Sequence, residues 1–373
     1  MNKISGWKDK LLLTPGPLTT SVKVKHAMLK DVGSRDYEFM GTVKEIREKL
    51  LDIAQVSMQD YTTIIMQGSG TFGIESVIST VIPPTGKLLV LVNGIYGERI
   101  VKIAKTLAIE VVELTSDENE EPSIDELRTL LKKNKSITTV AVVHCETTTG
   151  IINPIEKISK IIKSFKRTLI VDAMSSFGGI EINVGKLGID YLVSSSNKCI
   201  EGVPGFSFII AKKDELLKSE SYARSVSFNL YDQWKTLEQT GQFRFTPPTH
   251  ALLAFRQALG ELYDEGGVKA RAARYKENNR ALISGMSRLG FSCYLPESKR
   301  GWIITSFILP KVKNFSFEQF YNILNDLGYV IYPGKLTKVD SFRIGNIGRI
   351  YKSDIEDLLS AIERTMTLMG VKL

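Results

Sequence analysis

Lys198 is the residue of this sequence whose surroundings best suit nucleophilic chemistry. Residues 191–193 form a short apolar run that predicts a strand, and three serines and Asn197 lead from it to the lysine. Glycines and a proline then close the loop at Gly205. The surroundings of such an amine can lower its pKa and leave it able to attack a carbonyl. A loop lysine is more commonly a solvated surface charge, so other residues have to decide between the two interpretations.

Asp172 follows a second apolar run, residues 169–171, at another predicted strand end. Its carboxylate could simply cap the next segment. Alternatively, it could remain ionised in a buried site by pairing with a cationic ring nitrogen. The residues around Asp172 do not separate these two roles.

A glycine-rich turn at residues 68–73, Gly-Ser-Gly-Thr-Phe-Gly, lies between a predicted strand and a predicted helix. Its spacing matches the dinucleotide fingerprint, which also needs an acidic residue about 20 positions later to hold a ribose hydroxyl. The next strand ends instead in Asn93 and Gly94, which disfavours a dinucleotide. Backbone N–H groups and the hydroxyls of Ser69 and Thr71 can still hold a phosphate at a helix N-terminus. A plain tight turn is the alternative.

Lys198, Asp172 and the 68–71 turn have a specific meaning when they are taken together. A phosphate anchor, a partner for a pyridinium nitrogen and a lysine amine are the three protein groups that pyridoxal phosphate requires. The aspartate would keep the ring nitrogen protonated, so that electrons released at the substrate carbon flow into the ring. The lysine would bind the cofactor aldehyde and then act as general base and acid.

The elements that must position these residues are predicted to form a parallel sheet covered by helices on both faces. Short β-branched runs without polar alternation, separated by helices, are typical of such sheets, and their ligands bind beyond the carboxyl ends of the strands. One site should therefore form where the loops after five strands meet, at Met66, Val92, Val143, Asp172 and Ser194. The predicted strands are 61–66, 88–92, 110–114, 138–143, 168–172, 191–194 and 206–211, and the helices are 37–56, 74–82, 97–107, 123–133 and 154–165.

A second, smaller α/β unit is predicted after residue 266. A long helical stretch runs from Pro248 to about Leu289 and is interrupted by Gly266 and Gly267, which we take as the boundary. Beyond it, shorter elements alternate at 303–309, 316–327, 330–332, 341–344 and 353–368. We expect an α/β protein with an N-terminal arm (1–20) packed on the small domain, a large cofactor-binding domain (21–266) and a small C-terminal domain (267–373).

The composition of the 373 residues narrows the functional class. The net charge is +8, but the lysines are interleaved with glutamates, which favours solubility or attraction of small anions over nucleic-acid binding. No apolar run approaches the roughly 18–20 residues that cross a membrane. Three distant cysteines and the histidines His26, His144 and His250 show neither a disulfide framework nor metal spacing. We expect a cytoplasmic protein without a metal, a nucleic-acid partner or a membrane partner.

Six motifs, three of which contain the residues already discussed, occur in order along nearly the whole chain. They are Thr-Pro-Gly-Pro at 14–17, Gly-Ser-Gly-Thr at 68–71, Glu-Thr-Thr-Thr-Gly at 146–150, Val-Asp-Ala-Met-Ser-Ser at 171–176, Ser-Asn-Lys at 196–198 and Phe-Arg-Ile-Gly-Asn-Ile-Gly at 342–348. In this order they resemble the class V aminotransferase branch of the fold-type I pyridoxal phosphate enzymes. The resemblance implies a large domain with a mostly parallel sheet sandwiched by helices, a smaller C-terminal α/β domain, and a homodimer with shared active sites.

The resemblance also implies a role for each matching position. Tyr96 would stack on the pyridine ring of the cofactor, and Thr148 would form a hydrogen bond with the phenolic oxygen of that ring. Thr246 would cross a dimer interface to the cofactor phosphate of the neighbouring subunit, and Asn197 stands where relatives often have glutamine. A local role in capping or packing is the alternative for these residues. The implied cofactor-binding residues are Ser69, Gly70, Thr71, Tyr96, Thr148, Asp172, Asn197, Lys198 and Thr246, of which Asp172 and Lys198 are the catalytic ones.

Arg343 is the expected substrate anchor, because a guanidinium binds a carboxylate through two parallel hydrogen bonds; an ordinary ion pair is the alternative. Within the family, the runs at 242–250 and 332–335 are most similar to enzymes that move the amino group of 2-aminoethylphosphonate to pyruvate. One arginine could then bind the pyruvate carboxylate and the phosphonate in turn, with Arg35 and Arg244 as helpers. Alanine–glyoxylate or serine–pyruvate transamination is the main alternative. A cysteine desulfurase-like lyase and a cofactor-dependent regulator or binding protein are disfavoured.

Overall fold

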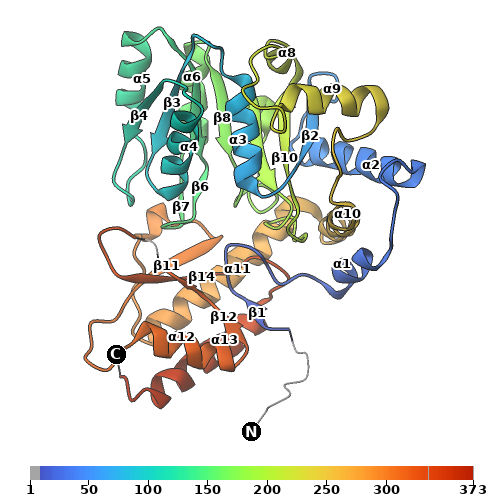
Figure 1. Cartoon of the computed structure of the whole chain (residues 1–373). Helices are drawn as coiled ribbons and strands as arrows, with labels where there is room; N and C mark the ends of the chain where they lie inside the picture. Colours follow the sequence, from blue (N-terminus) through green and yellow to red (C-terminus); the bar gives the residue numbers. More distant parts are fainter. Residues whose placement is uncertain (1–8, 335, 373) are drawn as a thin grey trace.

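A seven-stranded sheet forms the centre of the larger unit in this computed structural model, which describes residues 9–334 and 336–372 (Figure 1). The strand order is β2, β10, β9, β8, β5, β3, β4. All neighbouring pairs are parallel except those of β10, which runs antiparallel to both β2 and β9. The strands are β2 (Tyr61–Gln67), β3 (Lys87–Val92), β4 (Val111–Thr115), β5 (Ile137–Val143), β8 (Thr168–Asp172), β9 (Tyr191–Ser195) and β10 (Phe206–Lys212).

Helices cover both faces of this sheet. On one face, Gly73 of α3 (Gly70–Val81) lies against Ser207 of β10. Phe206 and Phe208 flank Ser207 and therefore point to the opposite face, because successive side chains of a strand alternate. There they pack on Phe255 of α10 (Thr249–Asp264). The other helices of this unit are α1 (Val22–His26), η1 (Ala27–Leu29), α2 (Tyr37–Ile53), α4 (Ile95–Thr106), α5 (Ile124–Lys133), α6 (Ile155–Ser164), α7 (Val184–Leu187), α8 (Lys213–Leu217) and α9 (Leu230–Thr240).

The smaller unit combines a three-stranded antiparallel sheet, in the order β11, β14, β13, with helices packed on it. Strand β1 (Leu11–Leu12) pairs in parallel with β12 (Tyr329–Val330), so the start of the described chain lies on this unit (Figure 1). Its elements are α11 (Gly267–Arg288), η2 (Glu297–Lys299), β11 (Ile304–Ile308), α12 (Phe317–Asp326), β13 (Tyr332–Pro333), β14 (Ser341–Gly345) and α13 (Lys352–Leu368). A short hairpin of β6 (Cys145–Glu146) and β7 (Ile151–Ile152) lies in the larger unit.

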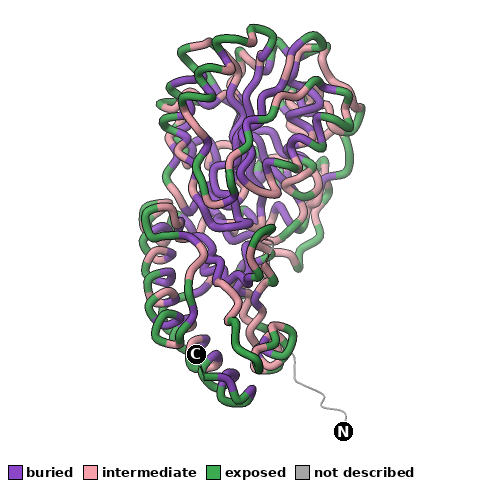
Figure 2. The backbone as a smooth tube through the Cα atoms, turned by 90° about the vertical axis from the view of Figure 1, so that its left-hand side faces the viewer, coloured by how far each residue is buried: buried purple, intermediate pink, exposed green. Residues whose placement is uncertain are grey.

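Each unit has its own hydrophobic core (Figure 2). The larger core gathers buried residues between Val24 and Leu262, and the smaller one gathers Leu13 with residues between Leu282 and Val371. These cores support the division into an arm (1–20), a large domain (21–266) and a small domain (267–373), which we keep as a proposal. Residues 1–8 of that arm lie outside the described residues.

The predicted α/β class and the mostly parallel central sheet are confirmed. Two local predictions are wrong. The turn expected through residue 73 already belongs to α3 from Gly70 onward, and the glycines there permit close packing, since a Cβ at Gly70 would lie 2.5 Å from Met174 Sδ. The strand expected at 330–332 is divided between two sheets, because Val330 pairs with β1 whereas Tyr332 pairs with β14.

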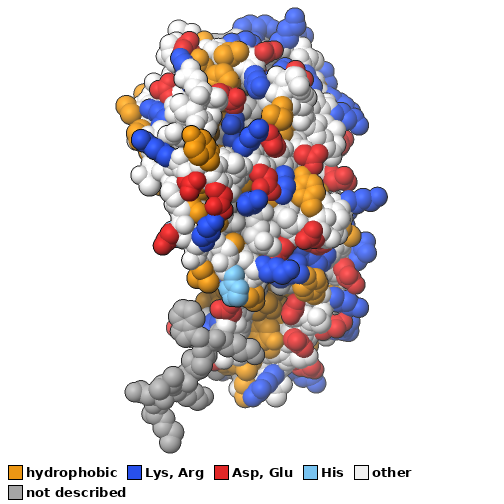
Figure 3. Space-filling model, turned by 90° about the vertical axis from the view of Figure 1, so that its right-hand side faces the viewer, with side chains coloured by type: hydrophobic (Ala, Val, Ile, Leu, Met, Phe, Trp, Pro, Cys, Tyr) orange, Lys and Arg blue, Asp and Glu red, His pale blue; other side chains and the backbone are white. Residues whose placement is uncertain are grey.

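The surface seen in Figure 3 carries lysines and arginines interspersed with aspartates and glutamates. On this face, the net charge of +8 is therefore not gathered into one basic stripe. None of the helices within 9–334 and 336–372 is long and apolar enough to cross a membrane.

Candidate active site

The loops after β2, β3, β5, β8 and β9 meet at a pocket of about 200 Å³. This is the carboxyl edge of the parallel strands, where ligands of such sheets bind. Most of the cofactor-binding residues expected from the sequence share this cavity, which is lined by Ser69, Gly70, Thr71, Tyr96, Asp172, Asn197 and Lys198. The structure therefore brings together groups that are up to 129 positions apart in the chain.

Lys198 lines this pocket, and its Nζ donates a hydrogen bond of 2.5 Å to the carbonyl of Pro15. Burial lowers the pKa of Lys198 to about 8, and negative groups around it, including Asp172, partly oppose this shift. A larger share of the amine is then neutral and nucleophilic near neutral pH. The absence of a side chain at Gly16 lets the lysine lie this close to the N-terminal segment, since a Cβ at Gly16 would lie 2.7 Å from Lys198 Nζ.

Asp172 also lines the pocket, as a buried carboxyl group. Burial raises its pKa to about 6, while the N–H of Met174 and the cations Arg99 and Lys198 act in the opposite direction. Oδ1 accepts a hydrogen bond of 2.9 Å from Met174 N. Such a carboxylate gains from a cation that enters the pocket, because pairing offsets the cost of burying its charge.

The N-terminus of α3 forms one end of the pocket. Ser69 precedes the helix without a side-chain hydrogen bond to it, so the first N–H groups of the helix have no side-chain cap. Arg99 Nη1 donates to Thr71 Oγ1 at 3.3 Å, and its guanidinium lies 4.9 Å from the centroid of the Tyr96 ring. Arg99 makes no ion pair with a carboxylate in the described part of the chain, so this end of the pocket suits a phosphate.

Arg99 and Glu146 are site residues that sequence reasoning missed. Arg99 lies three residues after Tyr96, and this spacing places both side chains on one face of α4. Glu146 is fully buried behind the pocket and accepts hydrogen bonds from Thr148 Oγ1 (2.6 Å) and Tyr96 N (3.2 Å). Burial raises its pKa to about 7. The sequence did hold a signal for Glu146, since this glutamate stands in a motif close after an apolar strand.

Thr148 does not line the pocket. Its hydroxyl donates to Glu146 Oε1 and accepts from Ile95 N at 3.3 Å, and the side chain is buried. Thr148 therefore positions the start of α4, and its contact with a cofactor ring stays a prediction.

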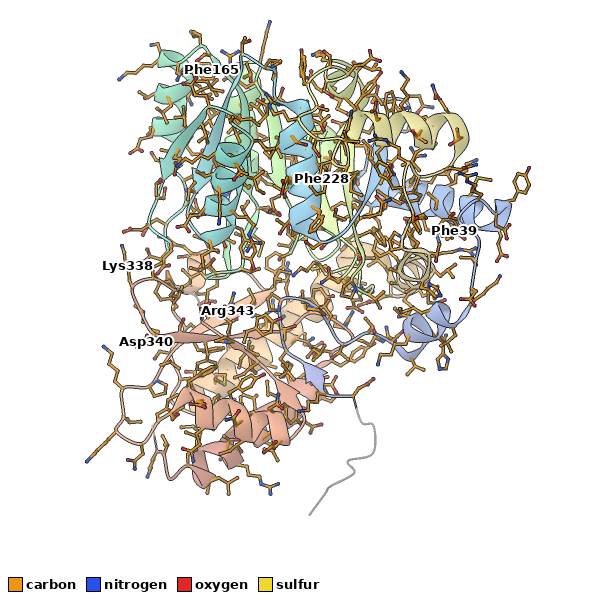
Figure 4. The ribbon with its side chains drawn as sticks, viewed as in Figure 1. Phe39, Phe165, Phe228, Lys338, Asp340 and Arg343 are labelled. Carbon is orange, nitrogen blue, oxygen red and sulfur yellow. The ribbon has the colours of Figure 1, made fainter. Side chains whose placement is uncertain are left out.

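Arg343 is almost fully buried on β14, where the small unit faces the large one (Figure 4). Its Nη1 donates to the carbonyl of Thr147 at 2.8 Å, and its Nε donates to the carbonyl of Pro333 at 3.2 Å. Thr147 lines the pocket, so these contacts hold the guanidinium at its margin. No carboxylate within the described ranges forms an ion pair with Arg343, which leaves its charge available to a substrate anion.

Thr246 is exposed and lies outside this pocket, in a separate surface hollow with Arg35 and Arg244. The hollow is adjacent to the end of β2, because Gln67 Nε2 donates to the carbonyls of Phe245 (3.1 Å) and Thr246 (3.3 Å). The structure thus does not bring Thr246 to Lys198 of its own chain. A contact with the site of a second subunit stays a prediction.

His144 lies beneath the site rather than in it. Its Nδ1 is 2.9 Å from Ser176 Oγ, and burial lowers its pKa to about 4, which keeps the ring neutral. Among the described residues, no group of three or more side chains is arranged to hold a metal ion.

Comparisons with known proteins place this geometry in a family. The family model "Aminotransferase class-V" matches residues 21–335. The chain is 54% identical over 355 residues to 2-aminoethylphosphonate–pyruvate transaminase of Bacillus cereus strain G9842, which covers 95% of this chain and 97% of the relative. It is 53% identical over 359 residues to the protein of the same name in Bacillus cytotoxicus, which covers 96% of this chain and 98% of the relative. The solved structure of alanine–glyoxylate aminotransferase from Nostoc sp. superimposes with a TM-score of 0.89 at 25% identity, covering 98% of this chain and 97% of that one.

Proposed function

The chain belongs to the class V aminotransferase family, and from this premise we propose that it moves the amino group of 2-aminoethylphosphonate to pyruvate, giving phosphonoacetaldehyde and L-alanine. One observation carries the choice of substrates: 54% identity over 95% of the chain to an enzyme named for this reaction. The solved alanine–glyoxylate aminotransferase shares the fold at only 25% identity.

We propose pyridoxal phosphate as the cofactor, because the residues present fit its chemical parts. Ser69, Gly70 and Thr71 would hold the phosphate at the N-terminus of α3, beside the guanidinium of Arg99, which forms no ion pair with a carboxylate among the described residues. The remaining contacts would come from Tyr96 on the ring face, Asp172 at the ring nitrogen and Lys198 at the aldehyde, with Asn197 and Thr148 nearby and Thr246 from a second subunit. When bound, the cofactor would supply a ring that accepts the electrons released at the substrate carbon.

The chain's own groups would bind the substrates and move protons. Arg343 would bind the carboxylate of pyruvate or the phosphonate of the donor, since its charge has no carboxylate partner within the described residues. Lys198 Nζ would remove a proton from the amino-bearing carbon and return it to the carbon on the other side of the nitrogen, because its lowered pKa suits it to both steps. Asp172 would keep its negative charge against a cationic ring nitrogen.

We further propose a homodimer in the cytoplasm. The separate position of Thr246, with the exposed aromatic ring of Phe245 beside it, supports a contact with a second subunit. The free cysteines Cys145, Cys199 and Cys293 support a reducing compartment.

One assay tests the proposed reaction. The holoenzyme is supplied with pyruvate and 2-aminoethylphosphonate, and the formation of L-alanine is compared with two controls, L-serine with pyruvate and L-alanine with glyoxylate. We expect the phosphonate donor to give the highest kcat/KM. A higher kcat/KM with either control pair would transfer the assignment to that activity.

A further inference from the structure

Four charged side chains, two of them buried and two partly buried, meet where the loop after Lys198 packs on helix α11. They form what we call the buried charge cluster: Glu201, Glu265, Arg271 and Arg274. Glu201 Oε1 lies 2.7 Å from Arg274 Nη2 and 3.5 Å from Arg271 Nη1. The Glu265 carboxylate lies 2.6 Å from Arg271 Nε and 2.7 Å from Arg274 Nε. The cluster joins the large domain to the first two turns of α11.

The buried charge cluster is poorly suited to a purely stabilising role. Burying ions is costly, and apolar residues of similar volume often stabilise a fold as well or better. Two of its atoms, Glu201 Oε2 and Arg271 Nη2, are buried without a hydrogen-bond partner within the described residues. Glu201 also has a φ of 65°, which residues other than glycine rarely adopt. Unsatisfied polar groups and unusual backbone angles in one place indicate a functional constraint.

Glu201 and Arg271 hold the backbone that follows Lys198. Glu201 N donates to the carbonyl of Lys198 at 2.7 Å. Arg271 Nη1 donates to the carbonyl of Cys199 at 2.7 Å, and the Tyr275 hydroxyl donates to Glu201 Oε1 at 2.6 Å. Side chains of α11 therefore fix the turn that presents the lysine.

Arg274 and Tyr275 also hold the segment that follows β14. Arg274 Nη1 donates to the carbonyls of Gly348 (2.6 Å) and Ile350 (3.0 Å), and Gly348 N donates to Tyr275 Oη at 3.3 Å. Gly348 and Ile350 lie three and five positions after Gly345, the last residue of β14, which is the strand of Arg343. The same two side chains thus contact both the lysine loop and the extension of the arginine strand.

We propose that Glu201 is a positioning residue that, through Arg274 and Tyr275, fixes the Lys198 loop relative to the strand carrying Arg343. The proposal rests on the proposed function, in which Arg343 binds the substrate anion and Lys198 moves the proton of the amino-bearing carbon. The anionic group is bonded directly to the reacting carbon in pyruvate and is separated from it by one methylene in 2-aminoethylphosphonate. Because the anion lies close to the reacting carbon in both substrates, a fixed position of Arg343 relative to Lys198 keeps that carbon within reach of the amine.

The test compares Glu201→Gln with Glu265→Gln in the holoenzyme. Both substitutions remove a carboxylate from the same two arginines, but Glu265 makes no contact with the lysine loop among the described residues. We expect Glu201→Gln to lower kcat about tenfold to a hundredfold, as displacement of a reacting group by about 1 Å does, with a much smaller change in KM. Without substrate, it should also shift the pH midpoint of the absorbance band of the lysine-bound cofactor.

The matched control, Glu265→Gln, should lose thermal stability but keep kcat within about twofold. This is the result expected of a residue that adds stability but does not position a reacting group. Equal losses of kcat in the two variants, or a parent-like kcat and pH midpoint in Glu201→Gln, would overturn the proposal. If Glu201→Gln does not fold, Tyr275→Phe, which removes one hydroxyl bonded to Glu201, is judged by the same criteria. The spectral readout needs no amino donor, so a parent enzyme inactive with 2-aminoethylphosphonate would count against the proposed function and not against this inference.

Discussion

Lys198 and Asp172 have pKa values shifted in opposite directions by the same physical cause. Burial disfavours the charged form of each group, so it lowers the pKa of the lysine to about 8 and raises that of the aspartic acid to about 6. Above pH 8, the amine is mostly neutral while the carboxyl group is ionised. The pocket can therefore offer a nucleophile and a negative charge at the same time, which two exposed residues could not do near this pH.

Cofactor capture by the apoprotein should accordingly depend on pH. The neutral fraction of an amine with a pKa of about 8 rises about tenfold between pH 7 and pH 9, so the rate of covalent capture of pyridoxal phosphate should rise by a similar factor. Stopped-flow absorbance measures this rate. Lys198→Ala should bind the cofactor without covalent capture and should not transaminate, whereas the exposed Lys186→Ala should behave as the parent does. A rate that rises only near pH 10, the range of a solvated lysine, would contradict the assigned environment.

Arg99 offers a second prediction at the residue scale. Its guanidinium lies beside Thr71 and forms no ion pair with a described carboxylate, so Arg99→Gln should weaken binding of pyridoxal phosphate about tenfold or more, the effect of losing a charge-assisted hydrogen bond. Binding of pyridoxal, which lacks the phosphate, should stay unchanged. Fluorescence titration measures both affinities, and Arg128→Gln on the exposed face of α5 is the control. Equal weakening for both compounds would show that Arg99 acts on the ring and not on the phosphate.

At the scale of elements, the N-terminal segment reaches from the smaller unit to Lys198. Strand β1 pairs with β12, Leu13 accepts a hydrogen bond from Gly345 N, and Pro15 accepts one from Lys198. The segment thus lies between the strand of Arg343 and the lysine. Its turn depends on Gly16, which has a φ of 121° and leaves no room for a Cβ beside Asn197 and Lys198.

Gly16→Ala should therefore impair the site more than the fold. A Cβ there would lie 2.7 Å from Lys198 Nζ and 2.8 Å from the Asn197 carbonyl, so the lysine must move, and we expect slower cofactor capture and a lower kcat. Gly41→Ala is the matched control, because a Cβ at that position in α2 meets no atom within 4 Å. It should stabilise the protein by up to about 1 kcal/mol through helix propensity. Parent-like capture and kcat in Gly16→Ala would refute the assigned crowding.

At the scale of the whole molecule, the position of Thr246 predicts a dimer with shared sites. Sedimentation should give about twice the chain mass of 41.6 kDa. In a mixed dimer of Lys198→Ala and Thr246→Ala chains, one site should lack both side chains and the other should be intact. The active site of the mixed dimer should then bind pyridoxal phosphate with parent affinity. Affinity equal to that of the Thr246→Ala homodimer would show that Thr246 serves the site of its own chain.

The sequence by itself determined the fold class and the family, and it predicted that Lys198, Asp172 and the 68–71 turn act together. Continuous apolar runs ending in Asp172 and near Lys198 predict strands whose carboxyl ends meet, because parallel strands of one sheet share that edge. The structure brings these residues and the 68–71 turn to one pocket. The roles expected of Tyr96 and Asn197 follow from the family resemblance, and each residue lies within a few positions of a strand end.

Only the tertiary structure decided which groups face the pocket and which lie behind it. Thr148 and Glu146 stand in a predicted motif, yet their side chains bond to each other beneath the lining. Arg99 and the buried charge cluster could not be found from strand ends, because they depend on which side of a helix meets which loop. Long-range packing of α11 against the Lys198 loop brings Glu201 and Arg274 together across 73 positions of the chain. No local pattern records such a contact, because periodicity predicts the buried face of a helix but not its partner.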